Sequence, residues 1–177
     1  MKIAVIGYSG SGKSTMARQL GSIYEIPVLH LDKVHFLTSW QERDDEEAKE
    51  MTAAFMENKA WVIDGNYSRF HSERRFLEAD KIIFFNFNRL TCLFWAYNRY
   101  RTYKGKTRED MADGCNEKLD YEFIKWLLID GRTKKRKNKY KNLINKYPEK
   151  VTILKNRKQA KEFLNNIINN KVILGRV

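Results

Sequence analysis

The chain has 177 residues, of which 42% are hydrophobic and 13% aromatic. This composition supports a packed core and excludes a disordered chain. No apolar run approaches the roughly 20 residues that a membrane-spanning helix needs. The two cysteines, Cys92 and Cys115, are too few for a disulfide scaffold and lack metal-ligand spacing. We therefore expect one cytoplasmic domain over residues 1–177, with no membrane contact.

The net charge of +12 is unevenly distributed along the chain. Residues 1–85 carry 11 Lys and Arg against 13 Asp and Glu, a net charge of −2. Residues 86–177 carry 23 against 9, a net charge of +14. A basic half of this size is typical of a nucleic-acid-binding protein or of a site that handles several phosphates. The charge alone does not separate these two alternatives.

Short apolar runs alternate with longer segments that suit helices, which predicts a doubly wound α/β domain with a parallel sheet. Between the last helices, residues 104–116 are polar and contain glycine, and they predict a mobile loop. The expected strands are residues 2–6, 28–31, 61–63, 81–85 and 151–154. The expected helices are residues 13–24, 44–57, 89–103, 117–130 with a continuation to about 147, and 157–169.

A phosphate-binding loop follows the first expected strand. Residues 7–14 read Gly-Tyr-Ser-Gly-Ser-Gly-Lys-Ser and match the pattern G-x-x-x-x-G-K-[ST] between a strand and a helix. Backbone N–H groups of such a loop point at phosphate oxygens, so Gly7, Ser9, Gly10, Ser11 and Gly12 are expected to hold a nucleotide. Lys13 is expected to reach the β- and γ-phosphates of ATP and Ser14 to bind Mg²⁺, with Thr15 assisting.

Two carboxylates follow apolar runs, at the strand ends where an open α/β sheet binds its ligands. Asp32 follows residues 28–31 and Asp64 follows residues 61–63. We expect Asp32 to orient or deprotonate an acceptor and to contact Mg²⁺, and Asp64 to hold Mg²⁺ through water. The two assignments can be exchanged, and an Asp in this place can also cap a helix.

Arginines form the next group, because the planar guanidinium binds phosphate oxygens two at a time. Any one of them is more often a solvated surface charge, and Arg99 and Arg101 cannot share a helix face. The candidates are Arg69, Arg74, Arg75, Arg99, Arg101, Arg108, Arg132 and Arg136. His35 is a candidate acceptor contact because it follows Asp32 closely, and the four tryptophans are expected in the core.

The motifs in combination resemble the DNA topology modulation (FlaR-related) proteins, which are adenylate-kinase-like P-loop proteins. The resemblance runs to about residue 161. It rests on residues 7–15, 28–32, 61–67 and 105–112, which read GYSGSGKST, VLHLD, WVIDGNY and GKTREDMA. It implies a five-stranded parallel sheet in the order 2-3-1-4-5, an acceptor-binding insertion at about residues 33–60 and a lid at about residues 99–120.

The resemblance also implies roles for individual residues. Arg99 and Arg132 would assist catalysis, and Arg101, Asn156 and Arg157 would bind the nucleotide. From the residues themselves, independently of the resemblance, we expect His35, Arg69, Arg75 and Arg108 to contact the acceptor together with Asp32. Adenylate kinases continue the strand-end Asp-Gly with Phe-Pro-Arg, whereas this chain continues with Asn-Tyr-Ser.

These observations predict an ATP- and Mg²⁺-dependent phosphotransferase that acts on a small acceptor. One alternative is a DNA-associated P-loop NTPase or regulator, although the sequence has no helix-turn-helix, zinc finger or other DNA-reading motif. Another alternative is a nucleotide-binding switch with little turnover. The identity of the acceptor does not follow from any motif.

Overall fold

A five-stranded parallel sheet forms the centre of the molecule. The computed structural model describes residues 1–174. The strand order is β2-β3-β1-β4-β5, so the first strand of the chain lies in the middle of the sheet. The strands are β1 (Lys2–Gly7), β2 (Val28–His30), β3 (Trp61–Asp64), β4 (Lys81–Phe85) and β5 (Val151–Leu154).

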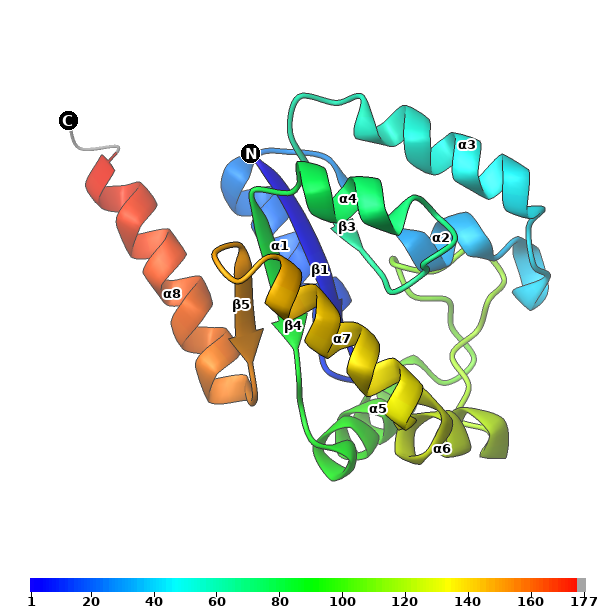
Figure 1. Cartoon of the computed structure of the whole chain (residues 1–177). Coiled ribbons are helices and arrows are strands. Elements are labelled where there is room, and N and C mark those ends of the chain that lie inside the picture. The colour runs from blue at the N-terminus through cyan, green and yellow to red at the C-terminus, as the bar shows by residue number, and fades with distance from the viewer. Residues whose placement is uncertain (175–177) are drawn as a thin grey trace.

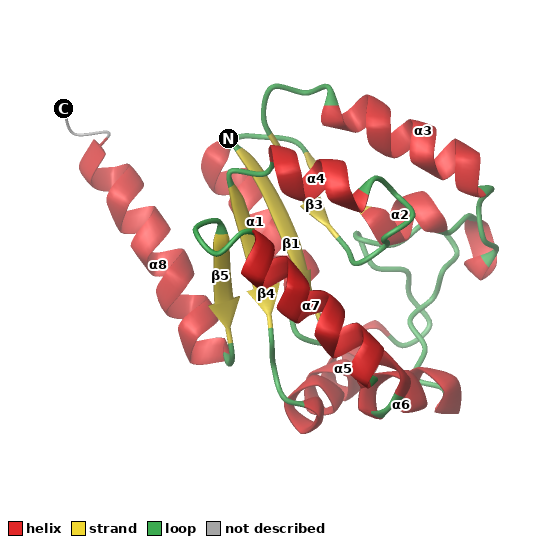
Figure 2. Cartoon of the chain, in the orientation of Figure 1, coloured by secondary structure: helices red, strands yellow, loops and turns green. Residues whose placement is uncertain are grey.

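Helices cover both faces of the sheet (Figure 1), with α1 on one face and α4 and α7 on the other. Figure 2 shows α5 and α6 beyond the carboxyl ends of the strands, where a long loop returns towards α2. Two short 3₁₀ helices are η1 (Thr38–Trp40) and η2 (Asp130–Arg132). The α-helices are α1 (Lys13–Tyr24), α2 (Leu31–His35), α3 (Asp45–Met56), α4 (Ser72–Glu78), α5 (Arg89–Tyr103), α6 (Tyr121–Leu128), α7 (Lys134–Lys146) and α8 (Arg157–Leu174).

Local sequence explains where several helices begin. The Asp44 side chain accepts hydrogen bonds from two backbone N–H groups of α3, and Asn88 accepts one from Thr91 in α5. Asp120 caps α6 in the same way. These caps satisfy N–H groups that have no partner within the helix. The strands are continuous apolar runs because both faces of the sheet are covered.

The predicted fold class, strand order and alternation of strands and helices are confirmed. The continuous helix expected from residue 117 to about 147 is wrong. It starts four residues later and is broken between α6 and α7, where Ile129 leaves helical geometry (φ −127°, ψ −70°). The strand expected over residues 28–31 ends at His30, because Leu31 begins α2. No helix in residues 1–174 is long and apolar enough to cross a membrane.

Candidate functional site

The phosphate-binding loop joins β1 to α1, as the sequence predicts. Two of its glycines are required by close backbone contacts. Gly7 has φ +137°, and a Cβ there would lie 2.4 Å from the Phe85 carbonyl oxygen. Gly10 has φ +73°, and a Cβ there would lie 2.4 Å from the Cys92 carbonyl oxygen. Side chains at either position would push the loop away from β4 and α5.

Asn66, the second residue after β3, holds the start of the loop through both groups of its side-chain amide. Its Oδ1 accepts from the Gly7 N–H at 3.0 Å, and its Nδ2 donates to the Gly7 carbonyl at 2.6 Å. Within the loop, Ser11 Oγ donates to the Tyr8 carbonyl at 2.7 Å. Lys13 Nζ donates to the same carbonyl at 3.2 Å, so its ammonium group lies over the loop.

A cavity of about 900 Å³ opens at the carboxyl ends of the strands, above this loop. It is lined by the loop, by Asp32 of α2, by the end of β3, by α5 and α6, and by residues between α5 and α6. Thirteen of the residues singled out in the sequence line it, Arg136 of α7 among them. They are Ser9, Gly10, Gly12, Lys13, Ser14, Thr15, Asp32, Asp64, Arg69, Arg99, Arg108, Arg136 and Arg157.

The two strand-end carboxylates both reach this cavity but have different partners. Asp64 is buried, and its Oδ2 lies 3.1 Å from His30 Nδ1. Its Oδ1 is buried and has no hydrogen-bond partner among the described residues. Asp32 Oδ1 accepts from the Tyr67 hydroxyl at 2.8 Å. Burial and the nearby Asp64 carboxylate raise the pKa of Asp32.

Two arginines of the predicted lid share one carboxylate. Glu117 Oε1 accepts from Arg99 Nη2 at 2.8 Å and from Arg99 Nε at 3.0 Å, and the second oxygen of Glu117 pairs with Arg108. Glu117 is buried, with 7% of its surface exposed. Burial lowers the pKa of Arg99. Burial opposes ionisation of Arg108 as well, but its carboxylate partners raise its pKa above the ordinary value.

Asp110 connects this arginine pair to the phosphate-binding loop. It pairs with Arg108 and is only 3% exposed. Burial opposes its ionisation, yet the Arg108 guanidinium and a hydrogen bond from the Ser14 hydroxyl lower the pKa of its carboxyl group. On its other side, Arg18 of α1 lies 3.8 Å from Asp110 Oδ1. The segment between α5 and α6 is thus closed over the loop by ion pairs.

Aromatic side chains line the cavity from three sides, which corrects the expectation that the four tryptophans belong to the core. Only Trp61 is fully buried, with 0% exposed, while Trp40, Trp95 and Trp126 line the cavity. The Arg157 guanidinium lies 3.3 Å from the centre of the Trp95 ring. Trp126 Nε1 donates to Ser9 Oγ of the phosphate-binding loop at 3.3 Å.

Arg75 is buried away from the cavity, so its position does not support the predicted acceptor contact. It is 0% exposed and is not among the described residues that line the cavity. Its guanidinium donates to the carbonyls of Gly65, Tyr67 and Phe70. Burial lowers its pKa to about 10. We correct its role to a structural one, because it supplies hydrogen bonds to the loop that follows β3.

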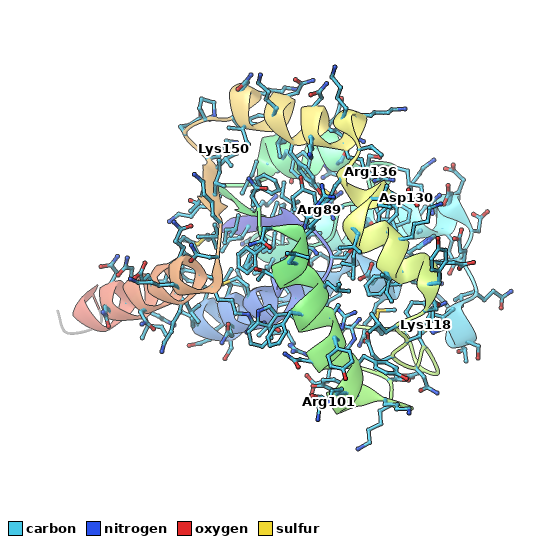
Figure 3. All side chains as sticks on the ribbon, turned by 90° about the horizontal axis from the view of Figure 1, so that it is seen from below. Arg89, Arg101, Lys118, Asp130, Arg136 and Lys150 are labelled. Atoms are coloured by element: carbon cyan, nitrogen blue, oxygen red, sulfur yellow. The ribbon has the colours of Figure 1, made fainter. Side chains whose placement is uncertain are left out.

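Three other predicted residues also lie outside the cavity lining. The Arg132 guanidinium stacks on the Tyr8 ring at 3.7 Å and donates to Cys92 Sγ, behind the phosphate-binding loop. Arg101 is exposed at the outer end of α5, as Figure 3 shows. Asn156 accepts from the Gln159 N–H and caps α8. These three side chains make other contacts in the structure, and their predicted ligand contacts stay predictions.

His35, Gly7 and Ser11 lie near the cavity but are not among the described residues that line it. His35 is 4% exposed, and its Nδ1 accepts from Arg69 at 3.1 Å. Burial lowers the pKa of His35, which fits a neutral imidazole that accepts from arginine. Gly7 and Ser11 belong to the phosphate-binding loop but, in the part of the chain that is described, do not line the cavity.

Several cavity residues were not singled out from the sequence. Asp110 was read as part of a polar loop, Glu117 as the first residue of an expected helix, and Asn66 and Tyr67 only as a departure from adenylate kinases. The resemblance gave one usable signal, since Asp110 belongs to the matched GKTREDMA segment. Nothing in the local pattern marks Glu117, because its contacts come from α5 and from Arg108.

No group of three or more His, Cys, Asp or Glu within residues 1–174 is placed to hold a metal ion. The cavity nevertheless contains the donor types that a water-mediated Mg²⁺ site uses, namely the Ser14 hydroxyl and the carboxylates of Asp32 and Asp64. The buried Oδ1 of Asp64 has no hydrogen-bond partner among the described residues, and a buried carboxylate oxygen of this kind fits a water or cation as its partner.

The fold and the loop together define a kinase-like P-loop protein. No protein-family model matches the chain, and no match is found among curated proteins. Among solved structures, the chain is similar to an uncharacterized protein from Eubacterium ventriosum, with a TM-score of 0.50 and 16% identity over 96% of this chain and 98% of that one. This likeness shows the fold alone.

Two kinases are also found, at lower structural similarity. Deoxyadenosine kinase from M. mycoides, solved with dCMP and dCDP bound, gives a TM-score of 0.49 and 13% identity over 100% of both chains. Shikimate kinase from Bacteroides thetaiotaomicron gives a TM-score of 0.44 and 14% identity over 100% of this chain and 99% of that one. The resemblance to DNA topology modulation proteins stays a prediction.

Proposed function

We propose that this protein is an ATP- and Mg²⁺-dependent phosphotransferase that acts on a small acceptor. One observation carries the proposal: the phosphate-binding loop, two strand-end carboxylates and two lid arginines line the same cavity. Phosphoryl transfer needs such a set of groups, because the enzyme positions the reactants and neutralises charge on the transferred group.

The nucleotide phosphates would lie on the backbone N–H groups of the loop, at the N-terminus of α1. Lys13 would turn from the Tyr8 carbonyl towards the β- and γ-phosphates, since a charge-assisted hydrogen bond is stronger than one to a neutral carbonyl. The aromatic surface of Trp95, with Arg157 stacked on it, supports a place for the base.

Ser14, Asp32 and Asp64 are the residues that would hold Mg²⁺, directly or through water. When bound, Mg²⁺ neutralises charge on the β- and γ-phosphates. The raised pKa of Asp32 supports a role as proton acceptor for an incoming hydroxyl group. The Tyr67 hydroxyl orients Asp32 through its hydrogen bond, so one carboxylate oxygen stays available to the cavity.

Arg99 and Arg108 would stabilise charge on the transferred group from the lid side of the cavity. Both lie there already, held by Glu117 and Asp110. Closure of this segment would also exclude water, which otherwise competes with the acceptor for the γ-phosphoryl group.

The proposal is tested by incubating the protein with Mg·ATP and a panel of nucleosides, nucleotides and hydroxy acids, with products identified by mass spectrometry. A phosphorylated product that forms with the wild type and not with Lys13→Ala is expected. If ATP binds and none of the compounds is phosphorylated, the phosphotransferase proposal fails in favour of a nucleotide-binding switch.

Helix α7 supports a second candidate function, a nucleic-acid-associated NTPase. It carries seven exposed cations and no acidic residue, and none of these cations forms a salt bridge within the described residues. The cations are Lys134, Lys135, Arg136, Lys137, Lys139, Lys141 and Lys146. A cationic helix of this kind attracts a phosphate backbone by charge, independently of sequence.

Binding of a fluorescent DNA duplex at several salt concentrations tests this candidate. Affinity that falls steeply with salt, and falls further when Lys135 and Lys139 are replaced by Glu, is expected if α7 contacts phosphates. ATP hydrolysis that DNA accelerates would favour this function over the phosphotransferase. Undetectable binding at low salt would remove it.

A further inference from the structure

Two segments that are far apart in the sequence close over the cavity together. Residues 36–42, here called the 36–42 turn, follow α2, and their ends pair through an antiparallel bridge between Phe36 and Glu42. Residues 114–118, here called the 114–118 arm, form the returning part of the predicted lid. Figure 3 labels Lys118, which lies beside the ribbon that leads from α2 to α3.

Trp40 makes most of the contacts between the turn and the arm. Its backbone N–H donates to Cys115 Sγ at 3.2 Å, and its indole N–H donates to the Asn116 carbonyl at 3.2 Å. The Lys118 ammonium lies 4.8 Å from the centre of the indole ring. In return, Cys115 Sγ donates to the Leu37 carbonyl at 3.1 Å. Cys115 is only 1% exposed beneath these contacts.

The backbone of the turn is strained at Trp40. Trp40 has φ +66° and the preceding Ser39 has φ +61°, which places two successive non-glycine residues in the left-handed region. A bulky side chain is rare there, and the conformation persists only where surrounding contacts hold it. The hydrogen bonds to Cys115 and Asn116 are such contacts. Glycine at position 40 would adopt the same backbone without strain.

The contacts of Trp40 lie on both sides of Glu117. Asn116 precedes Glu117 and Lys118 follows it, and both touch the indole group. Glu117 in turn holds Arg99 and Arg108 at the cavity. A continuous chain of contacts therefore runs from Trp40 through the 114–118 arm to the two lid arginines. Trp40 and Phe36 also line the cavity themselves, and their rings pack edge to face at 5.2 Å.

We propose that Trp40 is a positioning residue that holds the 114–118 arm closed, so that Glu117 keeps Arg99 and Arg108 directed into the cavity. Because the same turn forms part of the cavity wall, a molecule bound on that side contacts the segment that closes the lid. Lid closure and acceptor binding are coupled through this residue. The coupling to acceptor binding and the consequence for nucleotide binding rest on the proposed function, whereas the closure itself is a property of the chain.

The closure is tested without any ligand by the reaction of Cys115 with a thiol reagent such as DTNB. The parent carries Cys92→Ser, which leaves Cys115 as the only cysteine. Adding Trp40→Gly removes the indole contacts and relaxes the backbone. We expect labelling of Cys115 to become roughly tenfold faster, because the loss of one or two net hydrogen bonds makes opening of the arm about tenfold more frequent. Trp40→Phe, which keeps a ring but loses the indole N–H, is expected to give an intermediate rate.

Tyr121→Ala is the matched control, because Tyr121 is an aromatic residue directly after the lid and is 77% exposed. Its labelling rate should equal that of the parent. Thermal unfolding of Trp40→Gly checks that the protein is folded at the labelling temperature, so that the rate reports opening of the 114–118 arm and not global unfolding. Equal labelling rates for Trp40→Gly and the parent overturn the proposal.

The link to the arginines is tested by direct binding of ATP. Trp40→Gly should weaken ATP binding severalfold, and Arg108→Ala should weaken it without a further loss when combined with Trp40→Gly. Independent, additive losses overturn the positioning role. If the parent binds no ATP, the proposed function fails, while the labelling rates still test closure.

Discussion

The phosphate-binding loop and the lid border the same cavity but are built from different interactions. The loop is held by its own backbone between β1 and α1, and glycines at positions 7 and 10 permit close contact with β4 and α5. The segment between α5 and α6, residues 104–120, makes up most of the predicted lid of residues 99–120, contains no helix or strand and is held mainly by side chains. Its closing contacts involve Arg99, Arg108 and Trp40.

This difference indicates which half of the site can move. The loop backbone packs directly against β4 and α5 at Gly7 and Gly10, whereas ion pairs of long side chains can open one at a time. A rigid cradle for phosphates and a lid that opens are the two properties that a phosphotransferase requires. Changes in the loop should therefore affect nucleotide binding, and changes in the lid should affect opening.

The largest effect is expected for Lys13→Ala. It removes the ammonium group that would contact the phosphates, and we expect a loss of about 2–3 kcal/mol, or roughly 100-fold, in ATP affinity. Isothermal titration calorimetry measures the affinity, and circular dichroism checks that the fold is retained. Lys33→Ala, an exposed lysine on α2, is the control and should bind ATP normally. Unchanged affinity in Lys13→Ala would contradict the site assignment.

Asn66→Ala tests how the loop is held at its start. It removes both hydrogen bonds to Gly7, and we expect the free energy of unfolding to fall by about 1–2 kcal/mol, because the buried Gly7 N–H loses its partner. Urea unfolding measures this change. Asn58→Ala, which removes one exposed side-chain hydrogen bond at the end of α3, is the control. An equal and small effect of both substitutions would show that Asn66 does not hold the loop.

Glu117→Gln tests the lid instead of the loop. The substitution keeps the shape of the side chain but removes the charge that Arg99 and Arg108 share. We expect the free energy of lid opening to fall by about 1–2 kcal/mol, so that the lid opens more often, with little change in global stability. Hydrogen exchange of residues 104–120 measures the opening. Glu109→Gln is the control, because the Glu109 side chain is 84% exposed. Equal protection of residues 104–120 in the two variants would contradict a lid held closed by Glu117.

The smallest effect concerns His35, a buried residue whose ring packs against Phe36 and Tyr67 of the cavity lining. Burial lowers its pKa in the folded protein below the ordinary value of 6.5. The unfolded chain therefore binds a proton at a higher pH than the folded one does. Stability contributed by His35 is fully present above the unfolded pKa, and it is lost as the pH falls through the folded pKa.

Urea unfolding at several values between about pH 7.5 and pH 5 measures this loss. The wild type should lose stability towards low pH more steeply than His35→Gln, which cannot titrate. Parallel pH profiles for the two proteins would contradict a lowered pKa. His71→Gln, in the turn before α4, serves as a second comparison because His71 is far less buried.

Local pattern predicted the doubly wound α/β class and the phosphate-binding loop, whereas the strand order was implied by the family resemblance. Residues 7–14 predict the phosphate-binding loop, and the apolar runs before Asp32 and Asp64 predict strands that end at the cavity. The same kind of evidence did not show where the side chains of Arg75 and Arg132 lie. Arg75 is fully buried against backbone carbonyls, and Arg132 stacks on the Tyr8 ring.

The sequence by itself determined the order of strands and helices and the loop of residues 7–14, because hydrophobic periodicity, glycine freedom and helix capping act over a few neighbouring residues. Only the tertiary structure decided which arginines reach the cavity and which residues hold them there. Trp40 and Cys115 are 75 positions apart, and Arg99 and Glu117 are 18 apart. Contacts of that kind depend on how whole segments pack, and no local pattern records them.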